Sequence, residues 1–325
     1  TLLNADFAKA NVIGYQGDDI GSGDNIAACV KHFAAYGAPT AGRDYNNVEL
    51  SERTLRDDYL PSYEAAVKAG VALVMTSFNT LNRIPSSANK WLLRKILREE
   101  MGFDGAVISD WAAIEEIKNH NAALVNADAA RLALEAGTDI DMMTTCYPNF
   151  LKGVIERGEV SEALLGEAVL RVLELKNKLG LFENPYKDAD EEKEKELLLC
   201  EEHRKAARES AAETFVLLEN NGILPLKKED KIAFVGPYIE EKAIIGSWSI
   251  FGKNEEAVSV REGVEAKGVQ AAWEKGCEVL DVGVKMAGFG SAYENKKTQD
   301  EIDRMTEAAV AAAKDADKVV LCIGE

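Results

Sequence analysis

The 325-residue sequence has no apolar run that approaches the roughly 18 residues required to span a membrane, although 46% of its residues are hydrophobic. It is also short of positive charge, because 38 lysines and arginines accompany 56 aspartates and glutamates, which gives a formal net charge of −18. A phosphate backbone requires a basic binding face, so we exclude nucleic acids as well as membranes as partners. The sequence therefore indicates a soluble, globular protein that is long enough for two compact domains.

Metal-binding patterns are lacking too. The five cysteines are widely scattered and form no CxxC pair: Cys29, Cys146, Cys200, Cys277 and Cys322. No histidine has a partner at ligand spacing, so we expect neither a metal nor another cofactor. We interpret the cysteines as buried thiols, which fits a reducing, cytoplasmic compartment. No signal peptide is visible, but the sequence does not begin with methionine, so a processed leader stays open.

Between residues 26 and 143, apolar strand-like runs alternate with helical patterns such as SERTLRDDYLPSYEAAVKAG and KWLLRKILREEMG. The four runs are IAACVKHF at 26–33, VALVMTSFN at 71–79, GAVISD at 105–110 and TDIDMM at 138–143. This alternation predicts an α/β fold of parallel strands joined by crossover helices. An amphipathic helix capped by Ser161 and closing near Gly180 follows the fourth run.

A polar, charged and proline-marked stretch separates this pattern from a second one. We therefore predict a first domain at residues 1–182, a linker at 183–204 and a second α/β domain at 205–325. In the second domain, strands are predicted at 231–236, 277–281 and 318–324, with a helix at 300–317 before the last strand.

Only four strand-helix units precede the linker, whereas a closed (β/α)8 barrel needs eight units and about 250 residues. We therefore expect the second half of a TIM-type barrel followed by the N-terminal part of an α/β sandwich. Such a fragment would need the missing N-terminal and C-terminal segments in the same chain or as a partner chain. Expressed alone, it is expected to be inactive or poorly soluble, because half a barrel exposes strand edges.

Polar and aromatic residues stand at the ends of the predicted strands, where parallel α/β folds carry their chemistry. These residues are Lys31 and His32, Phe78 and Asn79, Asp110 and Trp111, and Met143 and Thr144. A carboxylate, an indole, an ammonium and an imidazole at one mouth suit a sugar, whose hydroxyls accept charged hydrogen bonds and whose anomeric carbon a carboxylate attacks. Each residue also has a plainer explanation, because Asp110 is in position to cap the following helix, Lys31 and His32 to form a surface pair and Trp111 to pack. The acidic pair Glu115 and Glu116 fits a solvated face.

Four motifs resemble glycoside hydrolase family 3, the family of β-glucosidases and β-xylosidases: KHFAAYG at 31–37, VMTSFNTLN at 74–82, GFDGAVISDW at 102–111 and ETFVLLENNGILPL at 213–226. The resemblance runs through essentially the whole chain. It implies that Asp110 is the catalytic nucleophile, that Lys31 and His32 bind sugar hydroxyls, and that Trp111 and Phe78 line the same pocket.

Two positions qualify this resemblance. The N-acetylhexosaminidase branch carries a second histidine where this sequence has Tyr36, which disfavours that branch. The family's general acid/base lies on the second domain, so Glu325, at the end of the last predicted strand, is one candidate and a loop beyond the end is the other.

The resemblance implies a retaining, exo-acting β-glycosidase without a cofactor, acting on a small-molecule or oligosaccharide β-glycoside, with glucosides ahead of xylosides. Two alternatives stay open. Lys31, at a strand end, suits the Schiff-base nucleophile of an aldolase-type barrel. The chain also fits a non-catalytic, carbohydrate-binding relative.

Overall fold

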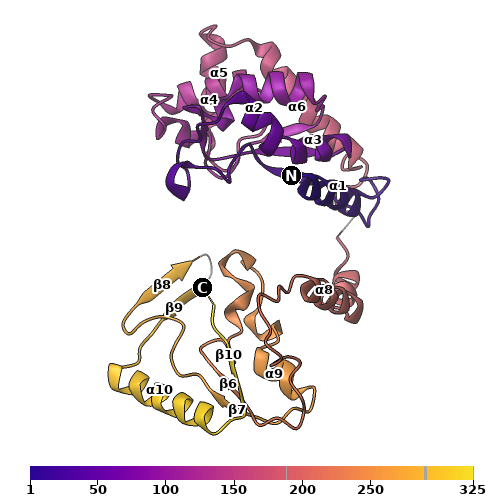
Figure 1. Ribbon diagram of the computed structural model, residues 1–325. Helices are drawn as coiled ribbons and strands as arrows, with labels where there is room; N and C mark the ends of the chain where they lie inside the picture. Colours follow the sequence, from indigo (N-terminus) through magenta and orange to yellow (C-terminus); the bar gives the residue numbers. More distant parts are fainter. Residues whose placement is uncertain (188, 289–290, 325) are drawn as a thin grey trace. The chain divides into compact units, whose positions relative to one another are not determined.

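The computed structural model describes residues 1–187, 189–288 and 291–324. The chain forms two compact units, Thr1–His203 and Arg204–Glu325 (Figure 1). Each unit has its own sheet and its own core, and each is described by itself below.

The first unit is built on a parallel sheet with the order β1-β2-β5, formed by β1 (Cys29–Phe33), β2 (Leu73–Thr76) and β5 (Ala106–Ile108). Three of the four predicted strands are thus confirmed as parallel neighbours. The fourth run forms a single parallel bridge between Ile108 and Ile140 instead of a strand. Its backbone still follows β5, since Ser109 N donates to Ile140 O at 2.9 Å, but Asp139 beside it serves an ion-pair cluster.

Helices separate the strands, as the alternating pattern predicts. Their bounds are α1 (Leu2–Gln16), α2 (Glu52–Thr54), η2 (Leu55–Tyr59), α3 (Pro61–Lys68), η3 (Ser86–Ala88), η4 (Trp91–Glu100), η5 (Glu115–Lys118), α4 (Asn126–Ala136), α5 (Cys146–Glu156) and α6 (Glu162–Lys178), with a short hairpin of β3 (Thr80–Leu81) and β4 (Ile84–Pro85). Helices α1 and α3 lie side by side (Figure 1). The predicted N-cap is confirmed, because the Ser161 side chain accepts from Ala163 N at 3.2 Å.

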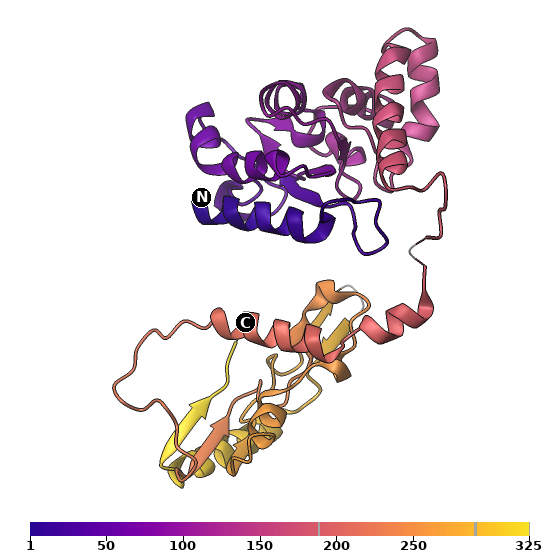
Figure 2. The ribbon, with the colours of Figure 1, turned by 90° about the vertical axis from the view of Figure 1, so that its right-hand side faces the viewer.

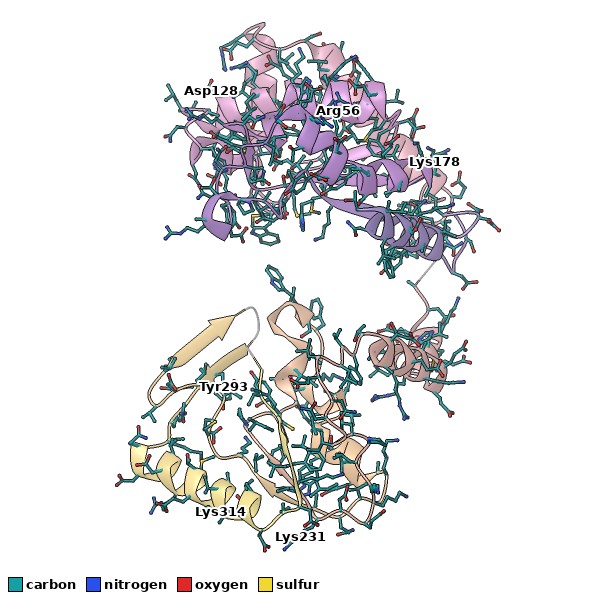
Figure 3. All side chains as sticks on the ribbon, in the orientation of Figure 1. Arg56, Asp128, Lys178, Lys231, Tyr293 and Lys314 are labelled. Atoms are coloured by element: carbon teal, nitrogen blue, oxygen red, sulfur yellow. The ribbon has the colours of Figure 1, made fainter. Side chains whose placement is uncertain are left out.

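The long helix predicted over 51–70 is divided. Proline has no N–H to donate, and the chain before Pro61 winds as the π-type turn η2, in which Leu60 N donates to Leu55 O at 3.0 Å. Arg56 projects from this turn (Figure 3) and its Nη1 lies 2.6 Å from Glu100 of η4. The π-type helix η4 buries one apolar face completely. That face packs in one core with Val74 of β2 and Val107 of β5, which holds these two strands in place.

A buried carboxylate joins three elements of this unit. Asp139 Oδ2 accepts from Arg98 Nη2 of η4 at 2.7 Å and from Val107 N of β5 at 2.8 Å, while its Oδ1 accepts from Arg171 Nη1 of α6 at 2.9 Å. Its side chain is only 1% exposed. A charge taken out of water to this extent requires such partners, so the cluster fixes β5 against two helices.

The second unit carries a parallel sheet with the order β10-β6-β7, a hairpin of β8 and β9, and helices that include α9 and α10. The bounds are β6 (Ile232–Val235), α9 (Val260–Glu265), β7 (Ala271–Glu274), β8 (Lys285–Gly288), β9 (Ser291–Glu294), α10 (Gln299–Lys314) and β10 (Lys318–Leu321). The strand predicted at 277–281 is wrong. The neighbour of β6 is β7, and across this pair Trp273 stacks on Phe234 with ring centroids 4.5 Å apart. A turn follows at Gly276, whose φ is 75°.

Helices α7 (Glu191–Leu197) and α8 (Glu201–Glu213) connect the two units along the chain (Figure 2). Neither contains a buried residue. At one end of the second unit lie Lys231 and Lys314 (Figure 3), and there Lys231 Nζ pairs with Asp315 at 2.6 Å. Among the residues that the structure describes, no helix combines the length and the apolar character that a membrane crossing requires.

Candidate active site

Asp110 lies two residues beyond β5 and is 8% exposed. Its Oδ1 accepts from Trp111 N at 2.7 Å. Its Oδ2 is buried and has no hydrogen-bond partner among the described residues. The carboxylate does not cap a helix through a later N–H, and the next regular turn is η5, five residues on. One oxygen is thus anchored, and the other is left available.

His32, on β1, faces this available oxygen, and its Nε2 lies 3.2 Å from Asp110 Oδ2. Burial lowers the pKa of the imidazole, and the ammonium of Lys31 lowers it further, against the opposing effect of Asp110 and Asp44. His32 is therefore neutral at pH 7, and its contact with Asp110 is that of a dipole with a charge instead of an ion pair.

Lys31 precedes His32 on β1 and is exposed. A Schiff-base lysine is normally activated by desolvation or by a neighbouring cation, and the exposure of Lys31 argues against the first of these routes. The ammonium remains close enough to influence the charge of His32. Its position suits a donor to a ligand hydroxyl.

Phe78 and Trp111 differ in their surroundings. Phe78 is half-buried, and its carbonyl lies 3.0 Å from His120 Nε2, which ties the end of β2 to the segment after η5. Trp111 is 56% exposed, so its indole is open to a ligand. The structure therefore brings Asp110 and His32 into direct contact. The ring of Tyr36 lies between His32 and Phe78, with its centroid 5.4 Å from that of His32 and 5.9 Å from that of Phe78.

The loop after β1 supplies three residues that sequence reasoning did not place in the site. The Tyr36 hydroxyl donates to Asp44, and the ring of Tyr45 lies 4.5 Å from that of Phe78. Burial raises the pKa of the Tyr36 phenol far above its ordinary value, with Asp44 adding to the effect, so this tyrosine does not transfer protons at neutral pH. One feature of the sequence could have placed these residues in the site, because the loop follows the carboxyl end of a predicted parallel strand.

Glu116 differs from what the sequence predicts. The solvated face expected for the acidic pair is wrong for this residue, whose Oε2 is buried and without a hydrogen-bond partner in the described residues. Burial raises its pKa, and the negative charges of Asp110 and Glu115 add to the rise. A second carboxyl thus lies within electrostatic range of Asp110.

Glu325 lies outside the described residues, so its role stays a prediction. Within 1–187, 189–288 and 291–324, no group of three or more histidine, cysteine, aspartate or glutamate side chains is arranged to hold a metal ion. The chemistry of the described site is therefore that of a carboxylate, a neutral imidazole, an ammonium and aromatic rings.

Comparison with known proteins places this geometry in context. Residues 2–175 match the glycosyl hydrolase family 3 N terminal domain, and residues 215–325 match the glycosyl hydrolase family 3 C-terminal domain. The whole chain is 38% identical to a periplasmic beta-glucosidase of Salmonella typhimurium and 34% identical to a putative beta-xylosidase of Formosa agariphila. It spans 44% and 40% of these two relatives, that is, less than half of their length.

Solved structures agree with the sequence comparison. The chain superposes over its full length on a mutant beta-glucosidase from Listeria innocua in complex with laminaribiose, with a TM-score of 0.89 and 43% identity, and covers 42% of that protein. The same enzyme in complex with gluconolactone gives a TM-score of 0.87 and 44% identity, again with 42% covered. The α/β fold, the ordered motifs and the two domain matches together show that this chain belongs to glycosyl hydrolase family 3.

Proposed function

We propose that this chain is part of a retaining, exo-acting β-glycosidase that hydrolyses terminal β-D-glucosyl or xylosyl residues through a covalent glycosyl-enzyme on Asp110. The observation that carries the proposal is the state of the Asp110 carboxylate at the exit of β5. One oxygen is held by a backbone N–H, and the other is buried, has no hydrogen-bond partner among the described residues and faces a neutral imidazole. The curated names of the relatives, beta-glucosidase and putative beta-xylosidase, support the substrate class.

The proposed reaction is a double displacement that uses this arrangement. Asp110 Oδ2 forms a bond to the anomeric carbon while the bond from that carbon to the leaving oxygen breaks, and a second carboxyl protonates the departing oxygen. The same second group then takes a proton from water, which displaces Asp110 and releases the sugar. Because His32 is neutral, it does not cancel the negative charge that makes Asp110 a nucleophile.

The neighbouring residues bind the sugar. Lys31 and His32 donate to non-reacting hydroxyls, and these hydrogen bonds strengthen as positive charge develops on the ring. Trp111 offers its exposed indole to an apolar face of the sugar, and Phe78 forms part of the wall on the side of β2.

The general acid/base is Glu325 or a carboxyl outside this chain. A retaining mechanism requires the second carboxyl about 5 to 5.5 Å from the nucleophile. Glu116 is not proposed for this role, since it follows Asp110 on the same segment.

For the architecture, we propose that residues 1–182 form the second half of a TIM-type barrel, that 183–204 link the domains and that 205–325 begin an α/β sandwich. The order β1-β2-β5 with the bridge to Ile140 supports consecutive barrel strands. Exposed apolar side chains support a need for further segments, in the same chain or as a partner: Phe7 of α1 is 60% exposed, and Leu218 in the second unit is 92% exposed.

A mechanism-based 2-fluoro glucoside tests the nucleophile. Applied to the complete polypeptide, it should leave one sugar adduct on the peptide that contains VISDW, detected by mass spectrometry. Asp110→Asn should abolish labelling, and Asp104→Asn, which changes an exposed acid, should leave it intact. An adduct on another carboxyl of active enzyme would refute the assignment.

Hydrolysis of nitrophenyl β-glucoside and β-xyloside distinguishes the alternatives. A polypeptide that binds these sugars but hydrolyses none of them would be the non-catalytic relative. Trapping of Lys31 by borohydride in the presence of a keto acid would instead establish the Schiff-base enzyme.

A further inference from the structure

We infer that Tyr45 is a specificity-determining residue that stacks on the leaving-group sugar, outside the pocket of the reacting sugar; this inference rests on the proposed function. The assignment concerns a loop residue that lies outside the motifs discussed for catalysis. It starts from the exposure and the backbone conformation of Tyr45.

Tyr45 combines a strained backbone conformation with a partly exposed side chain. Its φ is 62°, in the left-handed region that a bulky residue adopts only at a cost in free energy. The side chain is 43% exposed, so packing recovers only part of the stability that a buried aromatic ring provides. A strained residue that presents an aromatic ring to solvent beside a catalytic site is typical of a ligand contact.

The loop holds this conformation firmly. Asp44 Oδ1 accepts from Tyr45 N at 3.0 Å and also from the Tyr36 hydroxyl. Two residues on, Asn47 Oδ1 accepts from Thr80 Oγ1 at 2.7 Å, which ties the loop to the hairpin after β2. Tyr45 is therefore preorganised, and a ligand that stacks on its ring does not have to order the loop first.

The position of Tyr45 indicates which part of the substrate it meets. From Asp110, contacts lead through His32 at 3.2 Å, then Tyr36 at 5.4 Å and Phe78 at 5.9 Å, and end at Tyr45, 4.5 Å beyond. Tyr45 is thus separated from the nucleophile by three side chains. In an exo-acting enzyme the terminal sugar fills the inner pocket around the nucleophile. A ring at the end of this series of side chains, still within electrostatic range of Asp110, is therefore placed to meet the sugar on the other side of the scissile bond. The matching ligand is a β-linked disaccharide, whose second ring offers an apolar face to the phenol.

Two substrates separate this role from others. Laminaribiose carries a second sugar, whereas methyl β-D-glucoside carries only a methyl group in its place. We expect Tyr45→Ala in the complete polypeptide to lower kcat/KM about tenfold on laminaribiose and less than about twofold on methyl β-D-glucoside. Tyr45→Phe keeps the ring and should restore most of the loss. Tyr15→Ala, which removes a 53% exposed tyrosine from α1, should change neither substrate.

Calorimetric binding provides a readout that does not depend on turnover. In an Asp110→Ala background, Tyr45→Ala should weaken laminaribiose about tenfold and leave glucose unchanged. Equal losses on both ligands, or no loss on either, would overturn the assignment of Tyr45. Failure of the wild type to hydrolyse any glycoside would instead refute the proposed function, and the binding comparison would still decide the role of Tyr45.

Discussion

At the scale of single residues, the surroundings of Asp110 leave one oxygen of its carboxylate buried and without a hydrogen-bond partner among the described residues. Its neighbour His32 is kept neutral by burial and by Lys31, so no imidazolium pairs with the carboxylate. The backbone N–H of Trp111 fixes one oxygen and leaves the other available. This combination supports the proposed nucleophilic role of Asp110.

Lys31 provides a test of sugar binding. If its ammonium binds a hydroxyl of the reacting sugar, Lys31→Ala should lower kcat/KM. The expected loss of transition-state stabilisation is roughly 2 to 4 kcal/mol, because the hydrogen bond strengthens in the transition state. Steady-state assays on nitrophenyl β-glucoside measure the change. Lys9→Ala, on α1, serves as the control and should be silent. Wild-type kinetics for Lys31→Ala on every glycoside would remove the lysine from the site.

His32 makes a prediction about pH. The pKa of His32 in the folded chain lies below the ordinary imidazole value of 6.5, so the unfolded chain binds more protons than the folded chain as the pH falls below this value. The contribution of His32 to the free energy of unfolding of the first unit should therefore be fully present above about pH 6.5. It should decline as the pH falls toward the pKa of the folded state. Urea unfolding between pH 7.5 and 5 measures this slope.

The matched variants are His32→Gln and His203→Gln, the latter at an exposed position on α8. The slope should become shallower only for His32→Gln. An unchanged slope would mean that His32 titrates alike in both states.

At the scale of elements, β5 is held in place by a carboxylate that belongs to the run after it. Asp139 contacts η4, α6 and the backbone of Val107, so the strand that leads to Asp110 is fixed on the side of its helices. The cluster is structural, and it lies next to the strand end where the chemistry is proposed.

Asp139→Asn should lower the free energy of unfolding of the first unit by about 3 kcal/mol, because it leaves the buried guanidinium group of Arg98 without its counter-charge and removes the closer of the two acidic partners of Arg171. Urea denaturation of the full chain, followed by far-UV circular dichroism, measures the loss. Asp104→Asn, at an exposed position before β5, should cost less than about 0.5 kcal/mol. A loss for Asp139→Asn as small as that of the control would show that the cluster contributes little.

At the scale of the whole molecule, two units are joined by helices that neither unit buries. Helices α7 and α8 contain no buried residue, so apart from surface polar contacts such as that of Arg204 with the Glu256 carbonyl they depend on intrinsic propensity, which is marginal for helices of 7 and 13 residues. Local opening is therefore expected in this connection before either sheet opens.

Limited proteolysis with a glutamate-specific protease should accordingly cut first between residues 191 and 213 and leave two fragments that correspond to the two units. Mass spectrometry of early time points locates the cuts. First cuts within the segments that carry β1, β2 or β5 would contradict the prediction.

The sequence alone determined the parallel order of β1, β2 and β5, the cap at Ser161 and the position of Asp110 after a strand, because hydrophobic periodicity and capping act over a few neighbouring residues. The prediction of a strand at 277–281 was wrong because it rested on the same local pattern. An apolar run indicates burial, whereas the pairing of β7 with β6 brings together residues distant in the chain, such as Trp273 and Phe234, which local patterns do not record.

Only the tertiary structure decided which side chains meet. The contact of His32 with Asp110 joins groups that lie far apart along the chain, and the loop that carries Tyr45 is tied by Asn47 to Thr80 of the hairpin. Burial and neighbouring charges set ionisation, and a loop conformation is set by the hydrogen bonds that close it. Because these quantities depend on distances in space, they become available only once the chain is folded.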